Sequence, residues 1–350
     1  MSTATSARSR ARARTGARFL DPLVLSRIDN LELLARTVVD GFLTGLHRSP
    51  HLGFSLDFAE HRQYMAGDDV RRIDWKLFAR TDRHYIKLFE ADTNANMVVL
   101  LDVSRSMAYG SHGVTKLDYG RYLAASLTFL SHRQRDRVGL ATFDASIVAY
   151  VPPAMKHLDT VLHVLDRAAS SSAGEAGPTP TVRLGHRGGS AEAPPGSGIA
   201  ATSGMAAPLA QLADVLRRRG ILVLVSDFYG DPDEILAAVE PLVACGHDVL
   251  VQHVLDPAEL EFPFEDATAF EDMESGRQIP VIPGRLREAY RALVRAHVSA
   301  LEDRLTGIGA DYTLLDTSRP LDLALFRYLS ARERRSRTRA RRRGRGGPLR

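Results

Sequence analysis

Three oxygen-bearing side chains follow an apolar run in the segment MVVLLDVSRSM. Asp102, Ser104 and Ser106 stand at alternate positions directly after this run. A loop that alternates its side chains can point all three toward one ion, and carboxylate and hydroxyl oxygens without His or Cys suit Mg²⁺. The same residue types also cap helices and close turns. The pattern alone therefore leaves a metal site and a structural role both open.

A second aspartate, Asp227, leaves the apolar run ILVLVSDF in the same way. In a doubly wound sheet, ligands bind beyond the carboxyl ends of the strands, where the strand order reverses. We therefore expect Asp102 and Asp227 to lie near the same sheet edge and to act on an ion directly or through water. A structural alternative for Asp227 is that it caps the helix that follows.

The elements that would position these residues alternate along the chain. Apolar strand candidates (NMVVLLDV, RVGLATFD, GILVLVSDF, HDVLVQHVL and ADYTLLD) are separated by stretches with apolar residues at helical spacing. Strands that are apolar throughout are buried on both faces, and strand–helix alternation produces parallel crossovers. The sequence thus predicts an α/β fold, a Rossmann-like doubly wound domain with a mostly parallel sheet.

Composition suggests four parts. Residues 1–22 and 331–350 are predicted to be basic disordered tails, 23–95 a helix followed by a small β subdomain, and 96–330 the α/β domain, with a mobile Gly/Pro/Ser-rich loop at 170–204. Residues 1–18 carry five arginines without an acid and 332–350 carry ten arginines and one glutamate, so the total of +4 leaves −10 for the body. Such arginine-rich tails are usually solvated.

Several classes of protein are not expected. The chain has no apolar run long enough to span a bilayer and no apolar secretory segment, so we expect no membrane insertion. Its single cysteine, Cys245, fits a reducing cytoplasm. There is no phosphate-binding glycine loop, no paired-histidine metal motif and no nucleophile elbow. The tails lack interleaved aromatic residues, so specific nucleic-acid recognition is not expected.

Two motifs resemble known families. DVSRSM after an apolar strand resembles the metal-ion-dependent adhesion site, D-x-S-x-S, of von Willebrand factor A domains. The segment GFSLDFAEHRQYMAGDDVRRIDWKLFAR resembles the signature of the "domain of unknown function 58" family, a bacterial family. The matching residues are Gly53, Asp57, Phe58, Glu60, Arg62, Tyr64, Gly67, Asp68, Asp69, Arg71, Ile73, Asp74, Trp75, Ala79 and Arg80.

The resemblance implies a von Willebrand factor A-type domain whose Mg²⁺ leaves one coordination position for an acidic residue of a partner protein. It also implies association with a MoxR-type AAA+ ATPase in chaperone-like maturation or remodelling of other proteins. The adhesion site usually takes a threonine from a further loop. Here that loop reads GIAATSGM, so Thr202 is the nearest candidate and Ser203 the next.

The charged segment of residues 60–83 surrounds Trp75, the only tryptophan. It is interpreted either as a docking surface for the ATPase or as a set of ion pairs with Trp75 as an apolar anchor. Alternating charge signs favour the second interpretation, since buried charges must be paired.

Three hypotheses follow. The first is a non-enzymatic, Mg²⁺-dependent protein-binding module in which Asp102, Ser104, Ser106, Thr202 and Asp227 hold the ion. The second is a Mg²⁺-dependent phosphoester hydrolase that uses the same strand-end aspartates. The third is a nucleic-acid binder that acts through its arginine tails.

Overall fold

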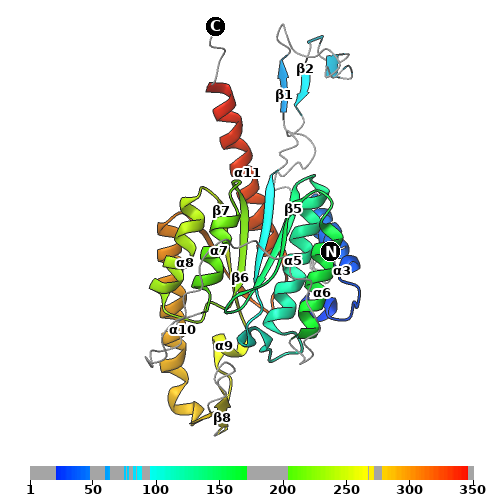
Figure 1. Ribbon diagram of the computed structural model, residues 1–350. Coiled ribbons are helices and arrows are strands. Elements are labelled where there is room, and N and C mark those ends of the chain that lie inside the picture. Colours follow the sequence, from blue (N-terminus) through cyan, green and yellow to red (C-terminus); the bar gives the residue numbers. More distant parts are fainter. Residues whose placement is uncertain are drawn as a thin grey trace, which may run out of the picture.

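A six-stranded sheet forms the centre of the computed structural model (Figure 1). The structure describes residues 21–47, 60–63, 75, 77–78, 82–83, 85–88, 95–171, 204–266, 268–271 and 278–345. The strand order is β10-β7-β6-β3-β4-β5, in which β5 runs antiparallel to β4 and all other neighbours are parallel. The strands are β3 (Asn96–Asp102), β4 (Arg137–Phe143), β5 (Ile147–Ala154), β6 (Gly220–Ser226), β7 (Asp248–Leu255) and β10 (Asp311–Asp316).

Helices cover both faces of this sheet, which confirms the predicted doubly wound, mostly parallel α/β fold (Figure 1). One face carries α3 (Leu31–His47), α5 (Lys116–Arg133), α6 (Leu158–Ser171) and α11 (Asp322–Arg345). The other carries α7 (Ala206–Val215), α8 (Pro232–Ala244) and α10 (Pro283–Gly307). Every residue of β3 and of β6 is buried. Apolar side chains on both faces of these strands explain why the strands read as continuous apolar runs.

The strand order reverses between β3 and β6. From β3 the chain passes through α5 on one face to β4, and from β6 it passes through α8 on the other face to β7. Such a reversal opens a crevice beyond the carboxyl ends of the two strands. Leu101 pairs with Val225, so Asp102 and Ser226 end their strands at the same level.

The N-terminal helix prediction is confirmed with one change. The expected helix of residues 23–46 is divided into α2 (Pro22–Leu25) and α3. The side chain of Asn30 accepts a hydrogen bond from the backbone N–H of Leu33, which caps the start of α3. Leu34, Val38, Val39 and Phe42 then bury one face of α3 in the core that it shares with α5.

Two small antiparallel sheets lie outside the central one. β1 (Glu60–Gln63) pairs with β2 (Tyr85–Leu88), and β8 (Thr268–Glu271) pairs with β9 (Gln278–Val281). Most of the GDDVRRIDW signature lies outside the described residues. Trp75 is 57% exposed and its ring meets Phe78 edge-on. Most of the charged residues around it lie outside the described part of the chain, so the docking and ion-pair interpretations both stay predictions.

Of the two predicted tails and the predicted loop, the structure describes mainly the C-terminal tail. Residues 1–20 and nearly all of the 170–204 loop lie outside the described residues. The disordered tail expected from residue 331 differs from the structure, in which α11 continues as a helix to Arg345. Arginine is a good helix former, and Arg332 makes an ion pair with buried Asp136, 3.0 Å between Nη1 and Oδ2.

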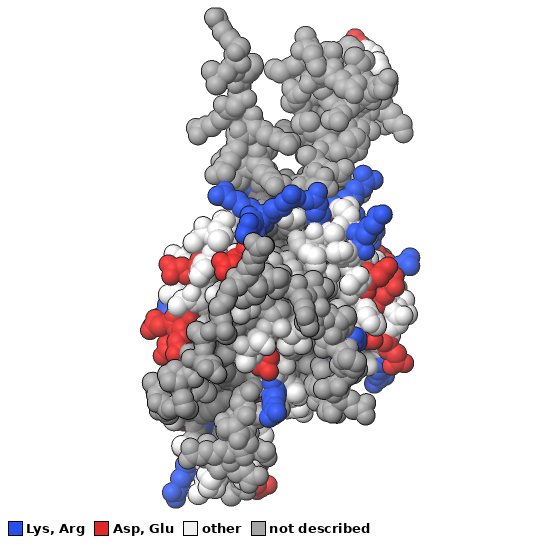
Figure 2. Space-filling model, viewed as in Figure 1, with Lys and Arg blue, Asp and Glu red and all other residues white. Residues whose placement is uncertain are grey.

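Charge is unevenly distributed over the face shown in Figure 2. Lys and Arg side chains gather at the end of the α/β unit from which α11 emerges, and Asp and Glu lie on its flanks (Figure 2). Within the described part of the chain, no helix is both long enough and apolar enough to cross a bilayer.

Candidate functional site

The structure brings Asp102, Ser104 and Ser106 together at the carboxyl end of β3. Asp102 is buried, and one of its carboxylate oxygens accepts a hydrogen bond of 2.9 Å from the backbone N–H of Ser104. The hydroxyl oxygens of Ser104 and Ser106 lie 3.1 Å apart. Ser106 belongs to the short 3-10 helix η3 (Arg105–Ala108), which follows the strand. The predicted clustering of these three side chains is therefore present.

The neighbouring strand contributes Ser226. Its hydroxyl donates to the second carboxylate oxygen of Asp102 at 2.6 Å and accepts from the backbone N–H of Phe228 at 3.0 Å. This bond joins the ends of β3 and β6 across the point where the strand order reverses. Sequence reasoning missed Ser226, although it directly precedes the predicted Asp227 and ends the strand that pairs with β3.

Asp227 lies close enough to influence the ionisation of Asp102. The pKa of Asp102 is raised to about 6, mainly by burial and then by the negative charge of Asp227, against hydrogen bonds from Ser226 and Ser104 that lower it. Two buried carboxylates near one another favour a cation between or beside them, because a positive charge offsets both repulsion and desolvation.

A cation from the chain itself already meets Asp227. The Lys116 side chain is completely buried, and its Nζ lies 2.8 Å from Oδ2 of Asp227 and 2.7 Å from Oε1 of Glu259. The ring of Tyr229 lies over the same ammonium, with its centroid 4.7 Å from Nζ. The ion pair and the hydrogen bonds together make the burial of this lysine tolerable. Asp227 is thus paired with a lysine, which sequence reasoning did not anticipate.

A close approach of α5 to the sheet positions Lys116 in the first turn of the helix. A Cβ atom added at Gly120 would lie 3.0 Å from Cδ1 of Leu101 and 3.3 Å from Cγ1 of Val225. Only a residue without a side chain fits there unless its neighbours shift. The start of α5 therefore lies directly against the ends of β3 and β6.

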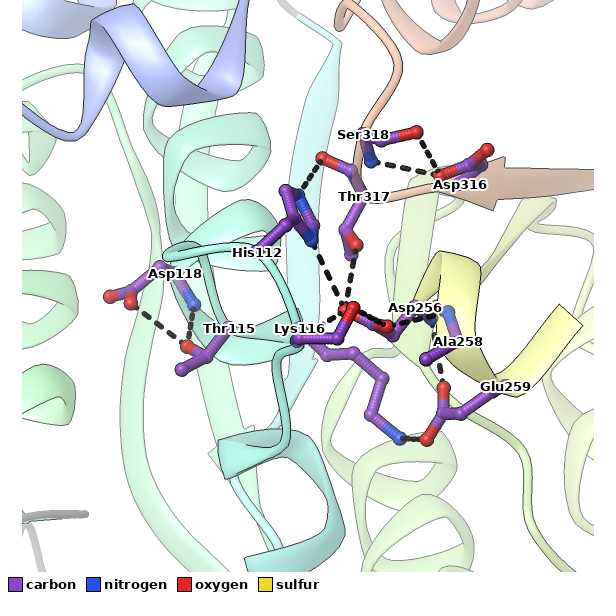
Figure 3. A network of polar contacts seen from close by, with 11 residues as sticks. His112, Thr115, Lys116, Asp118, Asp256, Ala258, Glu259, Asp316, Thr317 and Ser318 are labelled. Atoms are coloured by element: carbon purple, nitrogen blue, oxygen red, sulfur yellow. Dashed lines mark hydrogen bonds and ion pairs between the residues drawn. The ribbon is translucent and has the colours of Figure 1, made fainter. Parts of the chain in front are cut away.

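A second polar network holds the end of β7 beside this cluster (Figure 3). Asp256 caps α9 (Pro257–Glu261) in a capping box, with Glu259 accepting from the Asp256 backbone N–H at 2.8 Å. Asp256 also accepts from the hydroxyl of Ser111 at 2.5 Å and lies 3.3 Å from Nδ1 of His112. Burial acts to raise the pKa of Asp256, but the hydrogen bonds from Ser111 and Ala258 and the nearby His112 outweigh it, so this pKa stays below its ordinary value.

A sequence signal for Asp256 existed. It follows the apolar strand DVLVQHVL just as Asp102 and Asp227 follow theirs, so the rule that selected those two also selects Asp256. Lys116 and Glu259 carry no comparable signal, because their roles depend on how α5 and α9 meet the sheet.

The chemistry of the donors fits a hard divalent cation. Within the described ranges no group of three or more His, Cys, Asp or Glu side chains is arranged for a metal. The hydroxyl of Ser104 lies beside the carboxylate of Asp102, and the hydroxyl of Ser106 lies 3.1 Å from that of Ser104. Oxygen donors of this kind suit Mg²⁺, which commonly keeps several water ligands. Thr202 and Ser203, the candidates for a further hydroxyl, lie outside the described residues.

Comparison with solved structures returns distant similarities. An aerotolerance-related membrane protein from Bacteroides fragilis and the conserved hypothetical protein BatB from Bacteroides thetaiotaomicron each show 15% sequence identity and a TM-score of 0.40, over 67% of this chain and 97% of theirs.

Sequence comparison is more informative. The uncharacterized proteins Mb1516 of Mycobacterium bovis and Rv1480 of Mycobacterium tuberculosis are each 28% identical over 320 residues, 90% of this chain and 91% of theirs. MAV169 of Mycobacterium avium is 31% identical over 139 residues, 37% of this chain and 79% of its own. The family described as "Protein of unknown function DUF58" matches residues 60–300. The chain therefore belongs to the DUF58 family.

Proposed function

We propose that this protein is a non-enzymatic binding module that captures an acidic side chain of a partner protein through a Mg²⁺ ion. Asp102, Ser104 and Ser106 hold the ion, and a loop hydroxyl from Thr202 or Ser203 completes the protein ligands. The supporting observation is the pair of hydroxyls 3.1 Å apart beside a buried carboxylate, at the point where the strand order reverses. When bound, the ion supplies a positive charge with an open position for an oxygen ligand.

The role of Asp227 in this proposal is indirect. One of its oxygens is engaged by Lys116, so Asp227 acts through charge and through water rather than as a full direct ligand. Ser226 and the backbone of Ser104 orient the carboxylate of Asp102, and its Oδ atoms keep further lone pairs for an ion.

The same contacts favour binding over catalysis. A general base needs a carboxylate free to accept a proton from water. Asp227 and Glu259 are both held by the Lys116 ammonium, and in this proposal the remaining acceptor sites of Asp102 are taken by the ion. We therefore rank phosphoester hydrolysis second. Hydrolysis of a phosphoester panel by the wild type, with loss in Asp102→Asn, would reverse this ranking.

The partner that family resemblance implies is a MoxR-type AAA+ ATPase, with the two proteins acting together on a client protein. A cytoplasmic location is part of this proposal, since such an ATPase needs ATP and Cys245 is an exposed free thiol. The acidic residue that reaches the ion belongs either to the ATPase or to the client.

The test measures Mg²⁺ binding and partner capture separately. Isothermal titration calorimetry with Mg²⁺ is compared for the wild type, Asp102→Ala, and the double variant Ser104→Ala/Ser106→Ala, which removes donors without changing charge. We expect both variants to weaken Mg²⁺ binding at least about tenfold, corresponding to roughly 1.4 kcal/mol. Pull-down of a purified MoxR-type ATPase is then compared in Mg²⁺ and in EDTA.

A matched control is Asp144→Ala, since Asp144 also directly follows a strand of the central sheet but is exposed. Circular dichroism checks that each variant keeps its fold. Mg²⁺ binding that is unchanged in both site variants would contradict the metal site. ATPase capture that persists in EDTA and in Asp102→Ala would contradict binding of the ATPase through the ion.

A further inference from the structure

One face of α10 carries an apolar stripe that faces solvent. Ile282 directly precedes the helix, and Leu286, Ala289, Leu293, Ala296 and Ala300 follow it at alternating spacings of four and three residues. Such spacing places side chains along one line of a helix, as in the seam of a coiled coil. Ile282 is 57% exposed, Leu286 48% and Leu293 72%. We call these six residues the α10 seam.

The buried side of α10 is a different face from the seam. Leu301 and Leu305 are fully buried in the core below α8, and Arg287 and Arg291 reach back to carbonyl oxygens of Phe264 and Glu261 at 2.7 Å each. The helix therefore already has its intramolecular contacts on one side. The seam is a separate apolar face, and leucines exposed to this degree in the middle of a regular helix indicate a surface that another element covers.

The order of large and small residues in the seam is self-complementary in the antiparallel direction. When a second α10 lies antiparallel and the two helices cross level with Arg291, Ile282 meets Ala300 of the second copy, Leu286 meets Ala296, and Leu293 meets Ala289. Every large side chain thus faces a small one, and the reciprocal contacts repeat the match. Alternation of large and small residues lets two helices interdigitate closely, and identical surfaces that match each other are what a two-fold dimer requires.

The charged side chains beside the seam fit the same antiparallel two-fold pairing. Glu288 and Arg295 are both exposed on one flank of the seam. In the antiparallel pair, Glu288 of one copy comes level with Arg295 of the other, and the two-fold axis repeats the pair. A parallel arrangement instead brings Glu288 level with Glu288 and Arg295 level with Arg295. Ala292 and Ser299, which lie between the seam and this charged flank, are small enough for close approach.

We propose that the α10 seam is a homodimer interface, in which two copies of this chain pair through antiparallel α10 helices. The proposal does not depend on the metal site. The dimer forms equally in Mg²⁺ and in EDTA.

Sedimentation velocity of the full chain over a concentration series tests the interface. The wild type is expected to dimerise reversibly, and Leu293→Glu is expected to weaken association by at least about 100-fold, because each dimer loses two central apolar contacts. Leu33→Glu is the matched control, since Leu33 is an exposed leucine of α3, 55% accessible, away from the seam. It should dimerise like the wild type. Glu288→Arg should weaken the dimer, and the double variant Glu288→Arg/Arg295→Glu should restore it.

Cysteine cross-linking tests the direction of pairing, in a background where Cys245 is replaced by Ser. Ala292 lies beside the two-fold axis, so Ala292→Cys should form an intermolecular disulfide under mild oxidation. Ser299→Cys should not, because the two positions lie about 24 Å apart along the helix axes at about 1.5 Å per residue, far beyond disulfide reach. A wild type that stays monomeric at every concentration, a dimer that survives Leu293→Glu, or equal cross-linking at both positions would each overturn the proposal.

Discussion

The ammonium of Lys116 lies 2.8 Å from a carboxylate oxygen of Asp227, and both side chains are buried at the reversal of strand order. The lysine comes from the first turn of α5 and the aspartate directly follows β6. This pair ties the helix to the sheet edge at the place where the candidate metal donors gather. Glu259 of α9 shares the same ammonium and extends the tie to the end of β7.

Lys116→Met should destabilise the fold by about 3–5 kcal/mol, because the change leaves two carboxylates near the site without their buried cation. Urea unfolding at neutral pH in EDTA measures the loss. Lys156→Met is the control, since Lys156 is exposed and should change stability by less than about 0.5 kcal/mol. Equal effects of the two substitutions would show that the buried ion pair contributes little.

Removal of the Asp102 charge should stabilise the metal-free protein at neutral pH. Burial and Asp227 raise the pKa of Asp102 from 3.8 to about 6, so folding favours the protonated acid. The stabilising contribution of this proton is complete below pH 3.8 and is lost as the pH rises through about 6. Asp102→Asn keeps a neutral side chain at every pH and should therefore gain about 1–3 kcal/mol over the wild type at pH 7.5.

The measurement for Asp102 is urea unfolding in EDTA at pH 5 and pH 7.5, where the difference between variant and wild type should grow with pH. Added Mg²⁺ should raise the stability of the wild type and leave Asp102→Asn unchanged. A variant that is less stable than the wild type at pH 7.5 in EDTA would contradict this reading of the site.

His253 should make the fold less stable in acid, the opposite sign to the effect of Asp102. Its ring is fully buried between Phe228, His297 and Tyr312, and burial, followed by the charge of His297, lowers its pKa from 6.5 to about 3. The neutral ring is favoured in the folded state. The stability it contributes is present above pH 6.5 and is lost as the pH falls toward 3.

His253→Gln should remove this dependence. Between pH 6 and pH 4 the wild type should lose up to about 1.4 kcal/mol per pH unit more than the variant. His157→Gln is a suitable control because His157 follows β5 on the other side of the sheet and lies outside this aromatic cluster. Parallel pH profiles for wild type and His253→Gln would contradict the prediction.

The start of the arginine-rich segment should matter for stability. A chain that ends at Ala331 loses Arg332 and leaves the buried carboxylate of Asp136 without that ion pair, so it should be about 2–4 kcal/mol less stable. A chain that ends at Arg334 keeps Arg332 and should retain most of the stability of the full protein. Thermal unfolding of the two truncations side by side provides the measurement, and equal melting temperatures would refute a role for Arg332.

The central sheet is well predicted because its strands have a distinctive residue pattern. Strands such as β3 and β6 are apolar on both faces, and that pattern arises only where helices cover both sides. The aspartates at the ends of these strands follow from the same pattern. The arginine-rich end was less predictable, because composition indicated disorder, whereas the contact of Arg332 with Asp136 depends on a residue far along the chain.

The candidate site was only partly predictable for a similar reason. Asp102, Ser104 and Ser106 are local in sequence, so their spacing alone brings them together. Lys116 reaches Asp227 across more than a hundred residues, and nothing in its neighbourhood distinguishes it from a solvated lysine at the start of a helix. Gly120 explains the approach of α5 only after the sheet is known. Whether a carboxylate such as Asp227 is paired with a cation depends on long-range contacts of this kind.

The direction of α10 has a consequence for assembly. The helix begins beside the β8–β9 hairpin, beyond the carboxyl edge of the sheet, and runs back against the parallel strands (Figure 1). Two copies joined by antiparallel α10 helices therefore turn their sheets in opposite directions, so the two Asp102 clusters open at opposite ends of the dimer. Such an assembly is a two-ended connector. It can bridge two partner molecules without competition between them, and on a partner that displays many identical subunits it would gain strength through avidity.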